Sequence, residues 1–406
     1  MSAPKLRFKE FGGDWSLNPL KKFFPKIRNG FVGVATPYYV ENGIKYLQGK
    51  NIKDGKIDPT GLIHISEEFH LKKNNSRLRI NDILMVQSGH VGECAVVEKE
   101  YDNANCHALI VLSPHDVPQI NSHFVKDYFY TPIGKKIINQ VKTGNTIEHV
   151  LASEVKEISI SFPSKEEQTK IASFLSSVDQ KISQLTQKHE LLSQYKQGMM
   201  QKLFSQQIRF KADDGSEFGE WKTKKLEDIF SFSRGEPFSK TDISENGEFL
   251  CIHYGELFTK YKEVITNISS KTSLLAKNLG EIGDILMPSS DVTPDGLAKA
   301  SCLNVSNVFL GGDINILRPQ IPCSSEFFSY LINFEKQKVL LCVTGTTVKH
   351  VYNKDLKKIG YIYPCLEEQT KIANFLSAID QKIEGVAQQI EQAKTWKKGL
   401  LQQMFV

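Results

Sequence analysis

Two near-identical stretches constrain this chain more than any other feature of its sequence. The first runs over residues 166–204 and begins EEQTKIASFLSSVDQKI, and the second runs over residues 367–405 and begins EEQTKIANFLSAIDQKI. The two align without a gap at an offset of 201 residues, and the quoted parts differ at only three positions. Chance does not produce such a match, so the chain contains an internal repeat.

Each copy has the pattern of one long helix. Apolar residues recur every seven positions along two interleaved rows, and no proline interrupts either stretch. At 1.5 Å per residue, each copy would be roughly 58 Å long, so it needs a partner along its length. Two stripes of like pattern can bury each other, and we expect an antiparallel coiled-coil pair. An ordinary helical hairpin core is the plainer interpretation of the same two rows.

Three local signals refine this prediction. Ser164 and Glu167 have the spacing of a capping box ahead of the first copy, and Cys365 replaces the capping serine in the second. Gly198 and Gly399 fall at matching places in the two copies. Each glycine costs about 1 kcal/mol relative to alanine inside a helix, so we expect a use for it, namely close approach of another backbone.

Composition and charge limit the class of protein. The chain has 406 residues, 40% hydrophobic and 24% charged, which is typical of a soluble globular protein with two or three domains. It shows neither a secretory signal nor a run of eighteen apolar residues, so we expect a cytoplasmic protein. Seven scattered cysteines without a CxxC pair predict reduced thiols and no metal site. The net charge of +5, carried mainly by the first half, is compatible with nucleic acid.

The segments between the helical copies resemble each other more faintly. Residues 82–85 and 284–287 both read DILM, and TGNTIEHV at 143–150 matches TGTTVKHV at 344–351 with the same offset of 201. Short β-branched runs such as 31–40, 107–113 and 308–319 predict strands, and 122–140 and 325–340 predict helices. The fold class is therefore α+β, with two globular domains, two long helices and a pseudo-two-fold internal duplication. The predicted division is 1–165, first globular domain; 166–208, first long helix; 209–366, second globular domain; 367–406, second long helix.

No catalytic motif stands out in the sequence. It has no P-loop, no nucleophile elbow, no HExxH, and no Asn/Asp-Pro-Pro-aromatic motif of adenine methyltransferases. We therefore expect no catalytic residues and no cofactor in this chain.

Polar loops remain as places where a ligand could bind. A glycine-bearing turn follows one expected strand, and a polar turn occupies the related place in the second domain. Their side chains can read base edges, while nearby basic residues can meet phosphates. An ordinary surface turn and a solvated basic face are the plainer interpretations. The candidate DNA-binding residues are Lys45, Gln48, Lys50, Lys53, Gln87, Ser88, Gly89, His90, Ser289, Ser290, Asp291 and Thr293.

Aromatic residues lie beside the helical rows at matching places. Phe174 and Phe375 correspond to each other, as do Tyr195 and Trp396. Exposed aromatics of this kind are favoured contact points for protein partners, although burial against the chain's own globular domains is equally open. These four residues are our candidates for partner binding. The repeated corner motifs 143–149 and 344–350 are expected to be structural.

The chain resembles the specificity subunits of type I restriction–modification enzymes. The EQxxIAxFL pattern found twice, about 200 residues apart, is similar to the repeated helices of that family, and TGTTVKHV is similar to the motif that closes its target-recognition domains. The resemblance covers the whole chain. It departs from the family pattern in the missing serine cap of the second helix and in Asn145, where the second domain has Thr346.

The resemblance implies a function and a set of partners. Each target-recognition domain would read one half of a bipartite sequence in double-stranded DNA, and the helices would space the two domains and hold two methylation subunits. S-adenosylmethionine, ATP and Mg²⁺ would belong to the methylation and restriction/translocase subunits. A two-headed, non-catalytic scaffold that binds protein or glycan partners is the alternative. The bases that each domain reads are not legible from the sequence.

Overall fold

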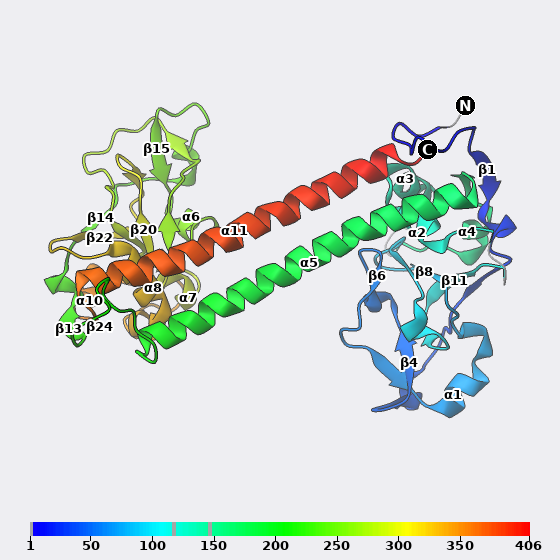
Figure 1. The fold of residues 1–406 in the computed structure, drawn as a ribbon, viewed down its shortest axis with the longest axis horizontal. Coiled ribbons are helices and arrows are strands. Elements are labelled where there is room, and N and C mark those ends of the chain that lie inside the picture. The colour runs from blue at the N-terminus through cyan, green and yellow to red at the C-terminus, as the bar shows by residue number, and fades with distance from the viewer. Residues whose placement is uncertain (1–2, 116–118, 145–147) are drawn as a thin grey trace. The chain divides into compact units, whose positions relative to one another are not determined.

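The computed structural model describes residues 3–115, 119–144 and 148–406, and it divides into two compact units (Figure 1). Unit 1 consists of Met1–Thr186 and Gln388–Val406, and unit 2 of Gln187–Ala387. The division falls inside both long helices, so each unit holds one globular domain with a part of each helix. The sequence-based boundaries at 165, 208 and 366 stay a prediction.

Both long helices are present. Helix α5 spans Lys165–Phe204 and helix α11 spans Leu366–Gln403, which ends two residues earlier than expected. Within unit 1, the start of α5 and the end of α11 share one hydrophobic core. In unit 2, the end of α5 and the start of α11 do the same. Coiled-coil geometry of the pair stays a prediction.

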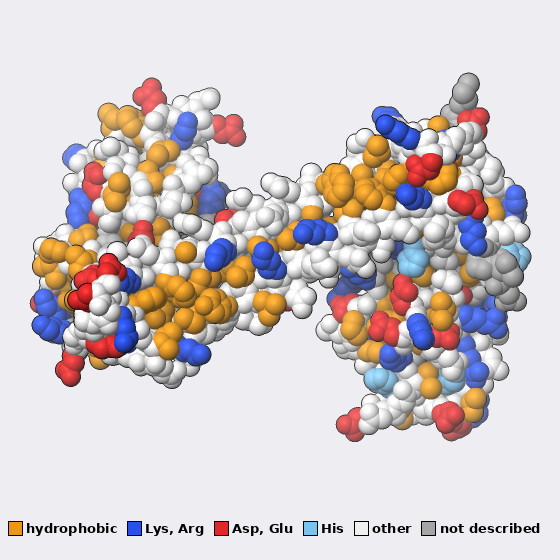
Figure 2. Space-filling model, viewed as in Figure 1, with side chains coloured by type: hydrophobic (Ala, Val, Ile, Leu, Met, Phe, Trp, Pro, Cys, Tyr) orange, Lys and Arg blue, Asp and Glu red, His pale blue; other side chains and the backbone are white. Residues whose placement is uncertain are grey.

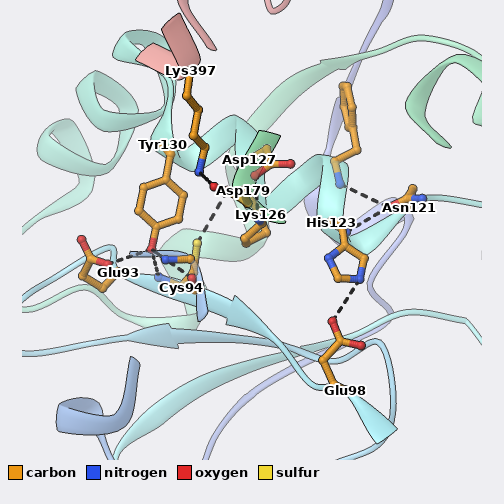
Figure 3. A network of polar contacts seen from close by, with 12 residues as sticks. Glu93, Cys94, Glu98, Asn121, His123, Lys126, Asp127, Tyr130, Asp179 and Lys397 are labelled. Carbon is orange, nitrogen blue, oxygen red and sulfur yellow. Dashed lines mark hydrogen bonds and ion pairs between the residues drawn. The ribbon is translucent and has the colours of Figure 1, made fainter. Parts of the chain in front are cut away.

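Each unit contains one ion pair that joins α5 to α11. In unit 1, Lys397 Nζ lies 2.6 Å from Asp179 Oδ1. A dashed line in Figure 3 marks this ion pair. In unit 2, Lys196 Nζ lies 2.8 Å from Asp380 Oδ1. The two lysines are 201 residues apart, and so are the two aspartates, so the repeat is preserved at the level of this contact.

The matched glycines do not serve the use expected of them. A Cβ atom built on Gly198 or on Gly399 would meet no other atom within 4 Å. The prediction of close backbone approach is therefore wrong within the described chain. Both positions present bare helix backbone to solvent.

The globular domain of unit 1 contains two four-stranded sheets among its described residues, and helices α2 and α3 pack on the first. The first sheet has the order β2-β11-β8-β9 and is antiparallel throughout. Its strands are β2 Lys26–Asn29, β11 Leu109–Ser113, β8 Ile83–Val86 and β9 Cys94–Val96. The second sheet comprises β10 Asn105–Cys106, β4 Ile44–Leu47, β7 Ile63–Ile65 and β3 Tyr39–Val40. Two short pairs are β1 Ser16–Pro19 with β12 Ser159–Phe162, and β5 Ile52–Lys53 with β6 Lys56–Ile57. The helices are α1 Glu67–Lys72, α2 Ser122–Tyr130, α3 Pro132–Val141 and α4 Ala152–Glu157.

The globular domain of unit 2 repeats this plan. Its main sheet has the order β14-β22-β18-β20-β16, in which the first four strands take the places of β2, β11, β8 and β9. These strands are β14 Phe230–Arg234, β22 Ile314–Pro319, β18 Ile285–Pro288, β20 Ser301–Leu303 and β16 Val264–Ile265. The smaller sheets comprise β17 Lys271–Thr272, β15 Phe249–Ile252 and β21 Phe309–Leu310; β13 Lys222–Lys225 and β24 Gly360–Tyr363; β19 Ser290–Asp291 and β23 Lys349–His350. The helices are α6 Tyr254–Thr259, α7 Pro294–Leu297, α8 Ser325–Phe334, α9 Lys336–Leu340 and α10 Asn353–Leu356.

The central strands explain why the two DILM runs are apolar without alternation. In β8, Ile83 and Met85 face the core shared with the long helices, while Leu84 faces a second core on the other side of the sheet. Strand β18 divides its residues in the same way. A strand covered on both faces needs apolar side chains at every position.

One strand prediction is largely wrong. Of the run 31–40, only Tyr39–Val40 forms a strand, and Thr36–Tyr38 forms a short 3₁₀ turn. Pro37 at the start of that turn and Gly33, with a φ of 142°, both interrupt extended pairing. The expected helices at 122–140 and 325–340 are each split in two, at Thr131 and at Glu335.

The repeated EEQ sequence fastens each helix start to its surroundings. The second glutamate of EEQ is buried and forms a bidentate ion pair with an arginine. Arg7 binds Glu167, and Arg209 binds Glu368. Ser164 Oγ accepts a bond from the Glu167 amide, but the carboxylate of Glu167 points to Arg7, so only half of the predicted capping box forms. These ion pairs tie an N-terminal arm and the matching linker after α5 to the two helix starts.

The glutamine of EEQ forms a hydrogen bond to the globular domain in each unit. Gln168 Oε1 accepts the Asn121 amide at the start of α2, and its Nε2 donates to Pro163 O. Gln369 makes the same two contacts with Ser324 N, at the start of α8, and Pro364 O. Each long helix is therefore hydrogen-bonded to the first helix of the layer that covers its own domain's main sheet.

We predict that Arg209→Ala lowers the free energy of unfolding by about 3 kcal/mol, because it leaves the fully buried Glu368 carboxylate without its cation. The matched control is Lys211→Ala, which removes an exposed pair with Glu217 and should change stability by less than about 1 kcal/mol. Guanidinium unfolding followed by circular dichroism measures both. Equal losses in the two variants would contradict the assigned role of the arginine.

Candidate functional site

The first group of candidate residues forms a turn at the end of β8. Gln87 O accepts the Val150 amide at 3.0 Å, and Ser88 forms an isolated β-bridge with His149. Gly89 has a φ of 82° and nothing within 4 Å of the place where a Cβ would lie. His90 is exposed. The corner motif thus anchors the turn, while Gly89 and His90 lie at the surface.

Two of the three basic candidates, Lys45 and Lys53, have side chains that already contact other groups of the protein. Lys45 lies on β4, donates from Nζ to Glu100 O at 2.8 Å and sits 4.8 Å from the centre of the Tyr101 ring. Lys53 pairs with Asp58 at 3.0 Å. Both cations are therefore engaged within the protein, which lowers their freedom to reach a phosphate.

Gln48 and Lys50 flank Gly49 next to the turn after β8. Gln48 Nε2 donates to Tyr39 Oη at 3.1 Å, and Lys50 is exposed. A Cβ on Gly49 would lie 3.5 Å from Val86, the last residue of β8. The fold thus brings the 48–50 turn beside the turn that starts at Gln87.

Tyr130 and Glu93, which lie side by side in Figure 3, hold the loop at residues 54–55 in place. Its hydroxyl accepts the Gly55 amide at 2.8 Å and donates to Glu93 Oε2 at 2.8 Å. The same carboxylate oxygen accepts the Asp54 amide. A helix of the domain therefore fixes the loop that follows Lys53, and this contact was not foreseen from the sequence.

In the second domain the candidate residues are differently exposed. Ser289 is buried, and its hydroxyl accepts a bond from Arg234 at 2.9 Å. Ser290 bridges to His350 in the β19–β23 pair. Asp291 is committed to its own turn, where it accepts the Val292 amide and the Thr293 hydroxyl. Thr293, next to α7, is the exposed member of the group.

Sequence reasoning missed two contributors to this loop. Arg234 ends β14 with half of its side chain exposed and reaches Ser289 and Asp313. Lys349 lies opposite Asp291 in the backbone pairing of strands β19 and β23. The motif TGTTVKHV, interpreted only as a structural corner, carried a signal for the second contact. It does close a corner, since Thr344 and His350 exchange backbone hydrogen bonds at 3.0 and 2.8 Å.

The four helix aromatics fall into two kinds. Phe174 packs edge-on against Phe8 at 5.7 Å and against Trp396 at 5.9 Å, and Phe375 packs against Phe210 at 5.7 Å. These phenylalanines are half-buried against the N-terminal arm and the linker. Tyr195 and Trp396 remain about half exposed. In Figure 2, hydrophobic side chains gather over the helices where they border each globular domain.

The described residues contain no group of three or more His, Cys, Asp or Glu side chains able to hold a metal ion. None of the described helices is long and apolar enough to cross a membrane. Across 3–115, 119–144 and 148–406, the features that stand out are thus surface loops on two similar domains and aromatic side chains on two helices. Such an arrangement defines a protein built from two repeated α+β modules.

Comparison with known proteins identifies the modules. The family model for the type I restriction modification DNA specificity domain matches the chain twice, at residues 13–194 and 219–395. The type I restriction enzyme MjaVIII specificity subunit of Methanocaldococcus jannaschii is 25% identical over 97% of this chain and 94% of that relative. The crystal structure of the type I restriction–modification S subunit from M. genitalium superposes with a TM-score of 0.65, at 18% identity, over 100% of this chain and 99% of that one. The chain therefore belongs to the family of type I restriction–modification DNA specificity subunits, which are non-catalytic and recognise DNA sequence.

We predict that Lys50→Gln weakens DNA binding by the chain and lowers the slope of log affinity against log salt by about one, because an exposed cation that meets a phosphate releases a counterion. Lys45→Gln serves as the control, since that ammonium already binds Glu100 O and the Tyr101 ring. Filter binding over a salt series measures both slopes. An equal change in slope for the two variants would argue against the 48–50 turn as a DNA contact.

Proposed function

We propose that each globular domain reads one half of a bipartite DNA sequence, and that the helices space the two domains and dock two methylation subunits. Restriction/translocase subunits then join this core. The observation that carries the proposal is the duplication itself: the same sheet order, the same EEQ contacts and the same Lys–Asp pair recur in both units. A duplicated module can present two similar, independent reading surfaces to DNA.

The chemistry in this proposal belongs to the partners. S-adenosylmethionine is held by the methylation subunits, and ATP and Mg²⁺ are held by the translocase subunits. This chain supplies sequence recognition and a scaffold. The turns after the buried strands β8 and β18 support this role, since they carry the exposed side chains of His90 and Thr293, and the exposed Lys50 lies in the neighbouring 48–50 turn.

The proposed docking surface for the methylation subunits lies on the outer faces of α5 and α11. Tyr195 and Trp396 correspond in the two repeats and are about half exposed. Gly198 and Gly399 lie three residues further along each helix, with open space above them. An exposed aromatic one turn from bare backbone offers an anchor beside a place where another chain can approach closely. The repeat presents this combination twice, which suits two identical partners.

We expect replacement of residues 209–366 by the matching domain of a relative to change one half of the recognised sequence and to leave the other half intact. The physical reason is that the contacts of the replaced domain to the helices, Gln369–Ser324 and Arg209–Glu368, are also made in equivalent form in unit 1. Mapping of methylated adenines in cells that express the hybrid with its partner subunits gives both half-sites. Simultaneous change of both halves would show that the two domains do not read DNA independently.

A further inference from the structure

The small sheet around β4 in the first domain matches the small sheet around β15 in the second domain, residue by residue. Strand β4 is flanked by β10, which runs parallel to it, and by β7, which runs antiparallel. Strand β15 is flanked in the same way by β21 and β17. Both strands have four residues, Ile44–Leu47 and Phe249–Ile252. His253 therefore takes the place in the second domain that Gln48 has in the first.

The turn after each of these strands is also closed by the same hydrogen bond. The Gln48 amide donates to the side chain of Asn51 at 3.1 Å, and the His253 amide donates to the side chain of Glu256 at 2.9 Å. Both residues stand directly ahead of a short helical element. The two turns read QGKN and HYGE, so they share no sequence motif. Their correspondence is visible only in the fold.

The start of α6 lies beside the candidate turn after β18. The carboxylate of Asp313 is close enough to interact electrostatically with the His253 ring, and Asp313 O accepts the Ser289 amide at 2.8 Å. Further along α6, the ring of Phe258 occupies the space that a Cβ on Gly296 would need, just beyond the same turn. The two turns of the second domain are therefore neighbours, as the corresponding turns are in the first domain.

A backbone hydrogen bond fixes the orientation and the tautomer of the His253 ring. Its Nδ1 accepts the Gly255 amide at 3.1 Å, so the proton of the neutral ring is on Nε2. Burial lowers the pKa of His253, and the neutral ring therefore prevails near pH 7. The ring is partly exposed and packs 4.4 Å from the ring of Tyr254 and 6.2 Å from that of Phe238. Among the residues that the structure describes, none is hydrogen-bonded to Nε2.

We propose that His253 is a base-reading residue of the second domain and that its Nε2–H donates a hydrogen bond to guanine. The inference rests on the proposed function, in which the second domain reads one half-site. An imidazole held in this way offers a donor and no acceptor to DNA. In the major groove guanine presents two acceptors, O6 and N7, and no donor, whereas cytosine presents a donor. Guanine is therefore the base that fits.

The first domain has a different chemistry at the corresponding place. The Gln48 side chain carries both a donor and an acceptor, and such an amide matches adenine, which presents N7 and its amino group together. The exchange of glutamine for histidine on one backbone arrangement fits two domains that read different half-sites.

The test uses the full chain expressed with its partner subunits, and it maps methylated adenines across the host genome. His253→Asn is the first variant, because asparagine caps helices well and can accept the Gly255 amide but is too short to reach a base. The half-site of the second domain should relax at one G·C position, where discrimination against other base pairs should fall about tenfold. His253→Gln, which copies Gln48, should shift the preferred base at that position from guanine towards adenine.

Thr259→Ala is the matched control on the same helix. Thr259 is exposed at the other end of α6 and donates to Gly255 O at 3.1 Å, so its loss should leave both half-sites unchanged. Thermal unfolding of the purified chains checks that each variant folds. Where methylation in cells is weak, competition binding of the purified complex to duplexes substituted at the relaxed position measures the same discrimination.

Relaxation at one G·C position by His253→Asn, with the control unchanged, supports the proposal. Unaltered specificity of both His253 variants overturns it, as does relaxation at a position without guanine. The proposed function is tested separately by replacement of the whole second domain, so it stands if the His253 variants alone fail. Relaxation in both half-sites would overturn both the role of His253 and the independence of the two domains.

Discussion

An ion pair between the two long helices organises each unit of this protein. Lys397 with Asp179, and Lys196 with Asp380, place opposite charges in a seam that is otherwise largely apolar. Removal of such charges from water is unfavourable, so only a register that brings the partners together is stable. Apolar rows alone tolerate a slip along the helix. We infer that the lysine–aspartate pairs select one register in each unit.

Further polar contacts join the globular domain of each unit to the residues of these ion pairs. In unit 2, Tyr330 of α8 donates to Asp380 at 2.6 Å, so the helix layer of the globular domain is bonded to the same carboxylate. In unit 1, the pair Lys126–Asp127 on α2 lies in the same polar network as Asp179 (Figure 3). Together with the EEQ contacts, the Tyr330–Asp380 bond in unit 2 and the electrostatic attraction between Lys126 and Asp179 in unit 1 hold each domain to its helices without involving the surface loops. The loops can therefore differ between domains while the scaffold stays the same.

The sequence made the scaffold predictable because its signals are periodic and repeated. The seven-residue rows predicted the helices, and the offset of 201 with the two DILM runs predicted the duplication. Contacts between distant segments were less accessible. Nothing in the spacing of Arg7 and Glu167 reveals that they meet, and Gly198 looks the same in sequence whether it is packed or bare. The run 31–40 was misassigned because its apolar content outweighed Gly33 and Pro37. The exposure and contacts of loop residues were the hardest to predict. The burial of Ser289 and the hydrogen bond from Lys45 to Glu100 O depend on the tertiary packing of the whole domain.

In the function that we propose, the two long helices measure the separation of the two half-sites. Four residues inserted after Gln187 and after Gln388 lengthen both helices at matched places while preserving the pairing on either side. The insertion adds roughly 6 Å of rise and about 40° of net rotation. One base pair adds about 3.4 Å and about 34°. Mapping of methylated adenines across the genome of cells that carry this variant should show the same half-sites with an unread gap longer by one or two base pairs. An active enzyme with an unaltered gap would contradict the claim.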